Sequence, residues 1–452
     1  MTKIISTDQT NDVRRDATEK IMREPGIPAG NPKAACDPSD MVGEDRRVNP
    51  AARSDPATAP KLSRLGAWML RQIGERLTCG SLTFVTPSGA RIEYRTAAPG
   101  PDAVWVLHRW RAIRRLLTHG DIGFGEAYMD GDWSTPDLSA LVELAARNDA
   151  SLSEALDGKL PARMLHRLLH LVRANTRSGS RRNITQHYDL GNAFYASWLD
   201  PGMTYSSAMF CDAGMTLEAA QTAKQDRVLE LLDVQQGQDV LEIGFGWGGM
   251  AERLAARGCR VVGLTLSSAQ RDHATQRLAA TGHADRVELR LQDYRDTSGV
   301  FDRIVSIEML EAVGEAYWPV FFDALRSRLT QGGVAVLQAI TIADERFASY
   351  RRVPDFIQRH IFPGGMLPSP SVMRAQIERA GLALHSVESF GASYARTLRE
   401  WRERFHAAWP DIAAMGFPPR FRRMWDYYLC YCEGGFRAGA IDVGLWRLER
   451  TG

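Results

Sequence analysis

Residues 241–250 read LEIGFGWGGM and place four glycines and one acid within ten positions. Around this stretch, apolar runs typical of strands alternate with segments typical of helices. The expected strands are QDVLEIGF (238–245), CRVVGLTLS (259–267), RVELRLQDY (286–294), FDRIVSIEM (301–309) and GGVAVLQAITI (332–342). This order predicts an α/β fold with a doubly wound, Rossmann-like sheet, in which the glycine turn joins the first strand to a helix.

The glycine turn is compatible with more than one ligand. Gly244, Gly246 and Gly249 satisfy GxGxxG, the pattern of dinucleotide sites, but such sites favour an acid at the end of the next strand, where Thr265 stands. S-adenosylmethionine has no pyrophosphate and needs only close approach to the backbone. Glu242 and Asp293, at the ends of the first and third strands, suit that ligand, with Asp293 placed to contact adenine. A turn without a ligand is the third alternative.

The bulk composition limits the function classes. The chain has 452 residues, of which 44% are apolar, which is enough for two or three folded domains. Because 56 basic residues balance 54 acidic ones, nothing predicts a nucleic-acid partner. The six cysteines form no CxxC pair, so we expect neither a metal site nor disulfides, and a cytoplasmic location. Residues 1–16 lack the apolar core of a signal peptide, and no run of about 18 apolar residues occurs, so we expect any membrane contact to be peripheral.

The chain divides by composition into four parts. Residues 1–59 are poor in apolar residues and predict a disordered tail. Residues 60–155 predict a smaller α+β domain, with helices over 61–77 and 106–121 and a hairpin over 81–96. Residues 156–182 predict a basic helix and linker; the acid-free stretch 158–188 suits either an anionic membrane surface or a solvated linker. Residues 183–452 hold the doubly wound sheet.

Several distinctive motifs point to one family. They are NITQHYDLGNAFYASWLDPGMTYSSAMF (183–210), VLEIGFGWGGMAERLA (240–255), GLTLSSAQ (263–270), FDRIVSIEMLEAVG (301–314), DFIQRHIFPGGMLPS (355–369) and YYLCYCEGGFRAG (427–439). Over residues 62–450 the chain resembles the cyclopropane-fatty-acyl-phospholipid synthases and their mycolic-acid relatives. The resemblance implies a methyltransferase that moves a methyl group from S-adenosylmethionine to the cis double bond of an unsaturated phospholipid acyl chain, forming a cyclopropane.

The resemblance assigns roles to individual residues. It implies a bound bicarbonate as general base, held by Glu311, Tyr394 and the backbone of Ile340, with Gln338 beside it and Cys432 at a position marked as active in the family. Glu242 joins the cofactor set through its place before the first glycine. The other expected cofactor contacts are Tyr205, Ser206, Gly244, Gly246, Gly248, Thr265, Leu266, Gln270, Asp293 and Tyr294.

Four residues near the expected base depart from the common family pattern. Ser207 replaces a cysteine, and Ala312, Gln338 and Ser393 replace histidines. The base decides the product, since proton loss from the new methyl group with ring closure gives a cyclopropane, and other losses give methyl- or methylene-branched chains. The segments EAVG (311–314) and LQAITI (337–342) also resemble a subgroup of the family that is linked to methyl- or methylene-branched fatty acids. A branched product is therefore an alternative.

Two further functions and the role of the N-terminal part stay open. The same fold could methylate a soluble small molecule, or it could be a membrane-surface module without catalysis. The N-terminal α+β domain carries basic helices and no catalytic constellation, so we expect it to dock on the inner face of the membrane or to form a homodimer. Arg109, Arg114 and Arg115 are the expected contacts to anionic lipid.

Overall fold

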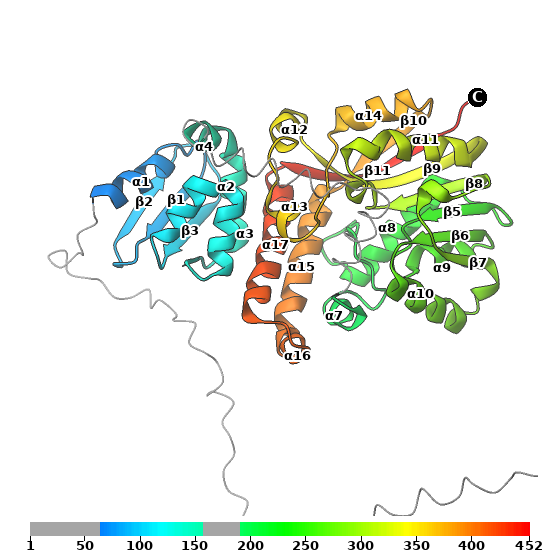
Figure 1. Ribbon diagram of the computed structural model, residues 1–452, viewed down its shortest axis with the longest axis horizontal. Helices are drawn as coiled ribbons and strands as arrows, with labels where there is room; N and C mark the ends of the chain where they lie inside the picture. The colour runs from blue at the N-terminus through cyan, green and yellow to red at the C-terminus, as the bar shows by residue number, and fades with distance from the viewer. Residues whose placement is uncertain (1–63, 157–189) are drawn as a thin grey trace, which may run out of the picture. The chain divides into compact units, whose positions relative to one another are not determined.

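The computed structural model describes residues 64–156 and 190–452 (Figure 1). The expected tail over 1–59 and most of the basic stretch over 156–182 lie outside the described residues. Within the described part, no helix combines the length and the apolar character needed to cross a bilayer.

The N-terminal part is built on a four-stranded sheet of order β2-β1-β3-β4. The expected hairpin is confirmed, since β1 and β2 pair antiparallel, while β3 pairs parallel with β1. The elements are α1 (Arg64–Gly74), β1 (Ser81–Val85), β2 (Arg91–Arg95), β3 (Asp102–Leu107), α2 (Arg111–Met129), β4 (Trp133–Ser134), α3 (Leu138–Arg147) and α4 (Asp149–Leu156).

The helix expected over 106–121 is wrong at its start. Residues 102–107 form β3, and α2 begins only at Arg111. Ala103, Trp105 and Leu107 alternate toward the core, and this period of two is the strand pattern that the adjacent basic helix obscured. The helix also bends at Gly120, whose φ of 60° and ψ of −141° are non-helical.

The second sheet has seven strands in the order β10-β11-β9-β8-β5-β6-β7. All five expected strands are present and pair parallel from β9 to β7, which confirms the doubly wound α/β fold. The sequence reading missed β10 and β11, which pair antiparallel with each other, while β11 also pairs antiparallel with β9. The strands are β5 (Asp239–Ile243), β6 (Arg260–Thr265), β7 (Val287–Leu291), β8 (Phe301–Ile307), β9 (Leu329–Ile342), β10 (Ala383–Ser389) and β11 (Ile441–Glu449).

Helices cover both faces of this sheet (Figure 1). Val240 and Val261 face the core under α8 and α9, whereas Leu241 and Ile304 face the core under α11 and α14. Neighbouring residues of one strand thus serve opposite cores, as expected for a sheet buried on both sides. The helices are α7 (Asn192–Ala196), α8 (Leu217–Leu232), α9 (Gly249–Ala256), α10 (Ser268–Thr281), α11 (Trp318–Arg328), α12 (Asp344–Tyr350), α13 (Phe356–His360), α14 (Pro370–Arg379), α15 (Gly391–Ala407), α16 (Trp409–Ala414) and α17 (Pro419–Arg437).

Helix α17 links the two sheets through buried polar contacts. The Tyr128 hydroxyl donates to Asp426 at 2.6 Å, and the Ser139 hydroxyl donates to Glu433 at 2.6 Å. All four side chains are nearly inaccessible to solvent, so each pair satisfies polar groups that would otherwise be costly to bury. The N-terminal sheet and α17, which leads into strand β11 of the seven-stranded sheet, therefore share one core.

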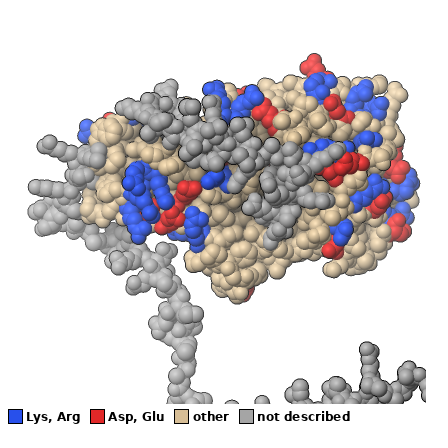
Figure 2. Space-filling view, in the orientation of Figure 1, with Lys and Arg blue, Asp and Glu red and all other residues tan. Residues whose placement is uncertain are grey.

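Two of the arginines expected at a lipid surface instead contact a buried carboxylate. Arg109 and Arg115 lie within 3.4 and 3.6 Å of Asp132, and Arg111 binds it through two contacts of 2.8 Å. Figure 2 likewise shows basic and acidic side chains lying next to one another on the face it draws. Arg114 remains exposed on α2.

We expect Asp132→Ala to lower the free energy of unfolding by about 3 kcal/mol, because the Asp132 side chain is fully buried and its loss leaves Arg109 and Arg111 without this carboxylate and Arg115 with Asp130 alone. Urea unfolding checks this. Asp323→Ala, which removes an exposed carboxylate paired with Arg379, is the matched control and should change stability by less than about 1 kcal/mol. Equal effects of the two substitutions would contradict the assignment.

Candidate active site

A cavity of about 180 Å³, partly open to solvent, lies at the carboxyl ends of β5, β6, β7 and β8. This edge of a doubly wound sheet is where ligands bind in such folds. Of the expected cofactor residues, only Gly248 lies outside the lining, where it caps α9. The expected residues that line the cavity are Tyr205, Ser206, Glu242, Gly244, Gly246, Thr265, Leu266, Gln270, Asp293 and Tyr294.

The glycine loop brings the backbone itself to the cavity. Gly244 has a φ of +86°, and a Cβ atom there would lie 3.0 Å from Cγ of Met309. Gly246 has a φ of +54° and open space where its Cβ would be. Both conformations favour glycine, and a side chain at either position would occupy or narrow the ligand space.

Two buried polar atoms in the wall lack partners within the described residues. They are Oε2 of Glu242 and the hydroxyl of Tyr294. Burial raises the pKa of Glu242 to about 8 against the opposing charge of Lys224, and burial raises the pKa of Tyr294 to about 12. Unpaired buried polar groups are costly, so both fit a site completed by a polar ligand.

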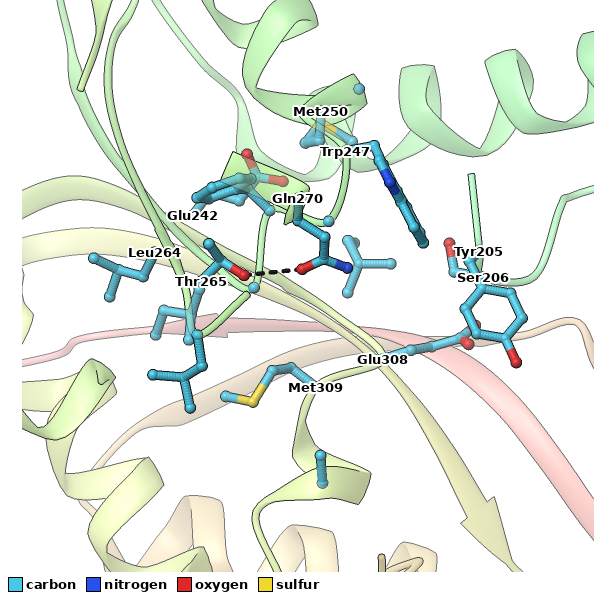
Figure 3. A pocket seen from close by; sticks show the side chains of 18 of the residues that line it. Tyr205, Ser206, Glu242, Trp247, Met250, Leu264, Thr265, Gln270, Glu308 and Met309 are labelled. Atoms are coloured by element: carbon cyan, nitrogen blue, oxygen red, sulfur yellow. Dashed lines mark hydrogen bonds between the residues drawn. The ribbon is translucent and has the colours of Figure 1, made fainter. Parts of the chain in front are cut away.

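The remaining expected contacts are held in place by their neighbours. Thr265 donates to Oε1 of Gln270 at 2.9 Å, the bond drawn in Figure 3. Asp293 accepts two contacts from Arg295, at 2.8 and 2.6 Å, so its carboxylate is fixed beside the cavity. These bonds orient the wall before any ligand arrives, which reduces the ordering cost of binding.

Glu308 is the principal site residue that the sequence analysis missed. It follows β8 directly, and its side chain extends toward Tyr205 and Ser206 (Figure 3). Its φ of +49° is left-handed, which costs a residue other than glycine about 1 kcal/mol. Strain of this kind gathers at functional sites. A charged residue directly after a buried strand, IVSIEM, was the available signal.

The Glu308 carboxylate accepts three hydrogen bonds. The backbone N–H of Ser207 and Nε2 of Gln338 donate to Oε1 at 2.8 and 2.7 Å, and the Tyr394 hydroxyl donates to Oε2 at 2.6 Å. Burial raises the pKa of Glu308, and these donors oppose the rise. The carboxylate is therefore held rigidly at the cavity wall.

The residues present do not fit the bicarbonate that the resemblance implied. Gln338 and Tyr394 direct their donors to Glu308, and a further anion would have to lie against its carboxylate. Two like charges at one site strongly disfavour each other. Glu308 thus stands where the bound anion was expected.

Glu311 lies beside this group with a different environment. Its Oε1 accepts from the backbone N–H of Ile340 at 2.5 Å, so two groups expected to hold a bicarbonate contact each other instead, while its Oε2 has no partner within the described residues. Burial, and then the charge of Glu308, raise the pKa of Glu311 to about 8. Glu311 is therefore a neutral acid at pH 7, and Glu308 is the carboxylate better supplied with donors.

The remaining expected residues lie near the site without a direct role in it. Burial and the nearby acids Asp355 and Glu308 raise the pKa of the Cys432 thiol, so it lacks the thiolate form that a nucleophile needs. Ala312 lines the cavity, and the Ser393 hydroxyl accepts from the backbone N–H of Phe210 at 3.1 Å, away from Glu308.

The raised pKa values of Glu242 and Glu311 predict a pH dependence of stability. Both groups hold a proton up to about pH 8 when folded, whereas they lose it near pH 4.5 when unfolded. The folded state then binds more protons, so the free energy of unfolding should fall as pH rises from about 4.5 to 8. Urea midpoints across that range measure it. Glu242→Gln and Glu311→Gln should each flatten the slope, and slopes equal to that of the unmodified chain would contradict both assignments.

Comparison with known proteins agrees with this geometry. A family model described as mycolic acid cyclopropane synthetase matches residues 175–446. The chain is 43% identical over 374 residues to the tuberculostearic acid methyltransferase UfaA1 of Mycobacterium tuberculosis, covering 79% of this chain and 86% of that protein. It is 38% identical over 345 residues to the cyclopropane-fatty-acyl-phospholipid synthase of Escherichia coli, covering 74% and 84%. The solved structure of mycolic acid cyclopropane synthase CmaA1 with SAH and CTAB matches with a TM-score of 0.56 at 33% identity, covering 60% of this chain and 98% of that one.

The fold, the glycine loop and these likenesses define an S-adenosylmethionine-dependent methyltransferase. The wall suits that ligand, because Gly244 and Gly246 leave room at the backbone and Glu242 offers an unpaired acceptor to an ammonium group. The chain belongs to the mycolic acid cyclopropane synthetase family.

Proposed function

We propose that this methyltransferase adds the methyl group of S-adenosylmethionine to the double bond of an unsaturated fatty acyl chain of a phospholipid, with Glu308 as general base. The observation that carries the proposal is the Glu308 carboxylate, which faces the cavity and is held by three donors. The relatives, one named a tuberculostearic acid methyltransferase and the other a cyclopropane-fatty-acyl-phospholipid synthase, support the lipid substrate.

The chemistry requires a dry, oriented site with a weak base. S-adenosylmethionine supplies an electrophilic methyl group when bound. Methyl transfer to one alkene carbon leaves a cation on the neighbouring carbon, and such a cation is so acidic that a carboxylate suffices to take its proton. The aromatic side chains of Tyr205, Trp247 and Trp401 gather near this part of the site and exclude water that would otherwise trap the cation.

We propose a methylene-branched chain as the product, because the carboxylate of Glu308 takes the donors of the bound anion that was expected together with ring closure. After a 1,2-hydride shift, the cation lies on the carbon that bears the new methyl group, and proton loss from that methyl gives a methylene branch (C=CH2). Direct proton loss from the methyl with ring closure gives a cyclopropane instead. A carboxylate fixed to the protein lies at one defined distance from the chain, and a displacement of about 1 Å is enough to change which path prevails. Cyclopropane formation is the second candidate, favoured by the likeness to the cyclopropane-fatty-acyl-phospholipid synthase of Escherichia coli.

Product analysis tests the proposal. The purified chain, incubated with S-adenosylmethionine and monounsaturated phospholipid, should add one CH2 to the acyl chain. A methylene-branched chain and a cyclopropane have the same mass. Proton NMR must therefore distinguish the =CH2 protons of the branch from cyclopropane ring protons. Ring protons alone would support the second candidate. Absence of any added carbon on lipid, with methylation of a soluble acceptor or with no turnover, would overturn the proposal.

We further propose that the N-terminal part docks this enzyme on the cytoplasmic face of an anionic membrane, with homodimer formation as the alternative role. The exposed Arg114 of α2 supports it, whereas Arg109 and Arg115 contact Asp132. Arg114→Glu should weaken sedimentation with anionic vesicles and leave the weak binding to neutral vesicles unchanged. Unchanged binding to anionic vesicles would exclude this surface.

A further inference from the structure

Lys224 is the only lysine in residues 64–156 and 190–452, although arginine is abundant there. It lies on α8 with 1% of its surface exposed and lines the cofactor cavity. Lysine differs from arginine in being a compact charge that can lose its proton when buried. A cation on the protein surface could equally be a lysine or an arginine. A single lysine in the described residues, placed in the cavity wall, therefore indicates a role in the site.

Helix α8 holds the segment that carries Tyr205 and Ser206. Nζ of Lys224 donates to Oγ of Ser206 at 2.7 Å, and one turn earlier Nε2 of Gln221 donates to the carbonyl oxygen of Ser206 at 2.8 Å. The next residue, Ser207, donates its backbone N–H to Glu308. Lys224 is thus connected to Glu308 through two hydrogen bonds, its own to Ser206 and that of Ser207 to Glu308.

The charges around Lys224 are acidic. Burial lowers its pKa to about 8, and the carboxylates of Glu308, Asp200 and Glu242 oppose that change, with Glu308 contributing most. Groups from every neighbouring element face Glu308. These are Lys224 of α8, Glu311 after β8, Gln338 of β9, Tyr394 of α15 and Cys432 of α17.

We propose that Lys224 is a positioning residue for methyl transfer, whose buried ammonium keeps Glu308 ionised and anchors Ser206 beside it. The inference rests on the proposed function, in which a C–H bond of the cationic acyl chain breaks and an O–H bond forms on Glu308. That proton must then leave for solvent before the next turnover. The ammonium stabilises the carboxylate over the neutral acid, so it favours both the starting state and this return step.

Three substitutions separate charge from hydrogen bonding. Lys224→Gln can keep the bond to Ser206 without the charge, Lys224→Met removes both, and Lys224→Arg keeps the charge. We expect the Gln and Met variants to lose about tenfold in kcat near neutral pH, with the acidic limb of the kcat profile moved to higher pH by about one unit. The difference in kcat between these two variants and the unmodified chain should become smaller above about pH 8, where Lys224 itself loses its proton. The Arg variant keeps a positive charge, so the acidic limb of its kcat profile should stay at the pH of the unmodified chain, whatever its rate at the plateau.

The protonation state of Glu308 can be measured without turnover, and it tests directly whether Lys224 keeps the carboxylate ionised. The infrared carboxylic-acid band that disappears in Glu308→Gln should be weak in the unmodified chain at pH 7 and stronger in the Lys224→Gln and Lys224→Met variants. Affinity for S-adenosylhomocysteine and thermal melting report whether each variant keeps its site and fold. A Lys224→Gln variant with the unmodified band and pH profile would overturn the inference. If no lipid is methylated by the unmodified chain, the proposed function fails, while the infrared band still tests Lys224.

Discussion

Glu308→Gln should lower acyl methylation by at least about 100-fold, the lower bound of what a positioned base contributes. The amide retains the shape of the side chain but cannot accept the proton that the cationic acyl chain must lose. Affinity for S-adenosylhomocysteine should change only a few-fold, because Glu308 lies at the far side of the cavity from Glu242 and Thr265 (Figure 3). Radiolabel transfer to phospholipid and calorimetric binding measure the two quantities.

Two further variants sharpen this result. Glu315→Gln, at an acid paired with Arg351 near the protein surface, is the matched control and should remain fully active. Glu308→Gly suits the φ of +49° and frees the donors of Gln338 and Tyr394. Added bicarbonate should then partly restore activity by occupying the vacated position. A Glu308→Gln variant with normal activity would exclude the carboxylate as base.

Gly244→Val should weaken binding of S-adenosylhomocysteine by more than 100-fold (about 3 kcal/mol). The left-handed φ of +86° strains any side chain, and the first added carbon already lies 3.0 Å from Cγ of Met309. Branching at the next atom would force the loop or Met309 into the ligand space. Calorimetric titration of the full chain checks the expected loss.

The control for Gly244→Val must carry the same backbone strain away from the cavity. Gly282, the residue that caps α10, has a φ of +76° and open space around it. Gly282→Val should therefore reduce stability to a similar extent while leaving ligand affinity unchanged. If both substitutions reduce affinity equally, the effect of Gly244→Val would be a general loss of fold, and the close approach of the loop to the ligand would not be supported.

The sequence was sufficient where the signal was local. β5, β6, β8 and β9 were predictable because strands buried on both faces are largely apolar, and β7 because VELRL alternates apolar and charged residues; the turn was predictable because it requires glycine. β10 and β11 were missed because ALHSVES and IDVGLWRLE contain polar residues and lie far from the glycine turn in sequence. They become strands through antiparallel pairing, β11 with β9 and β10 with β11, and such pairing is non-local.

The candidate site was predictable in part for the same reason. Residues in the glycine loop and at strand ends were found from their place in a motif. Glu308 was missed because it lies in the same motif as Glu311, residues 301–314, and the motif alone does not distinguish the two acids. Only the structure shows that Gln338 and Tyr394 donate to Glu308. Lys224 has no local signal, since a lysine in a polar helix is ordinarily solvated, and its burial follows from how α8 packs on the sheet.

The bicarbonate dependence of the unmodified enzyme tests the central claim most directly. Methyl transfer to phospholipid should be measured in buffer freed of carbon dioxide, and again after bicarbonate is added. If Glu308 is the base, the two rates should agree, because the donors at that position already bind a carboxylate. A rate that falls on depletion and returns in a saturable manner with bicarbonate would contradict the account.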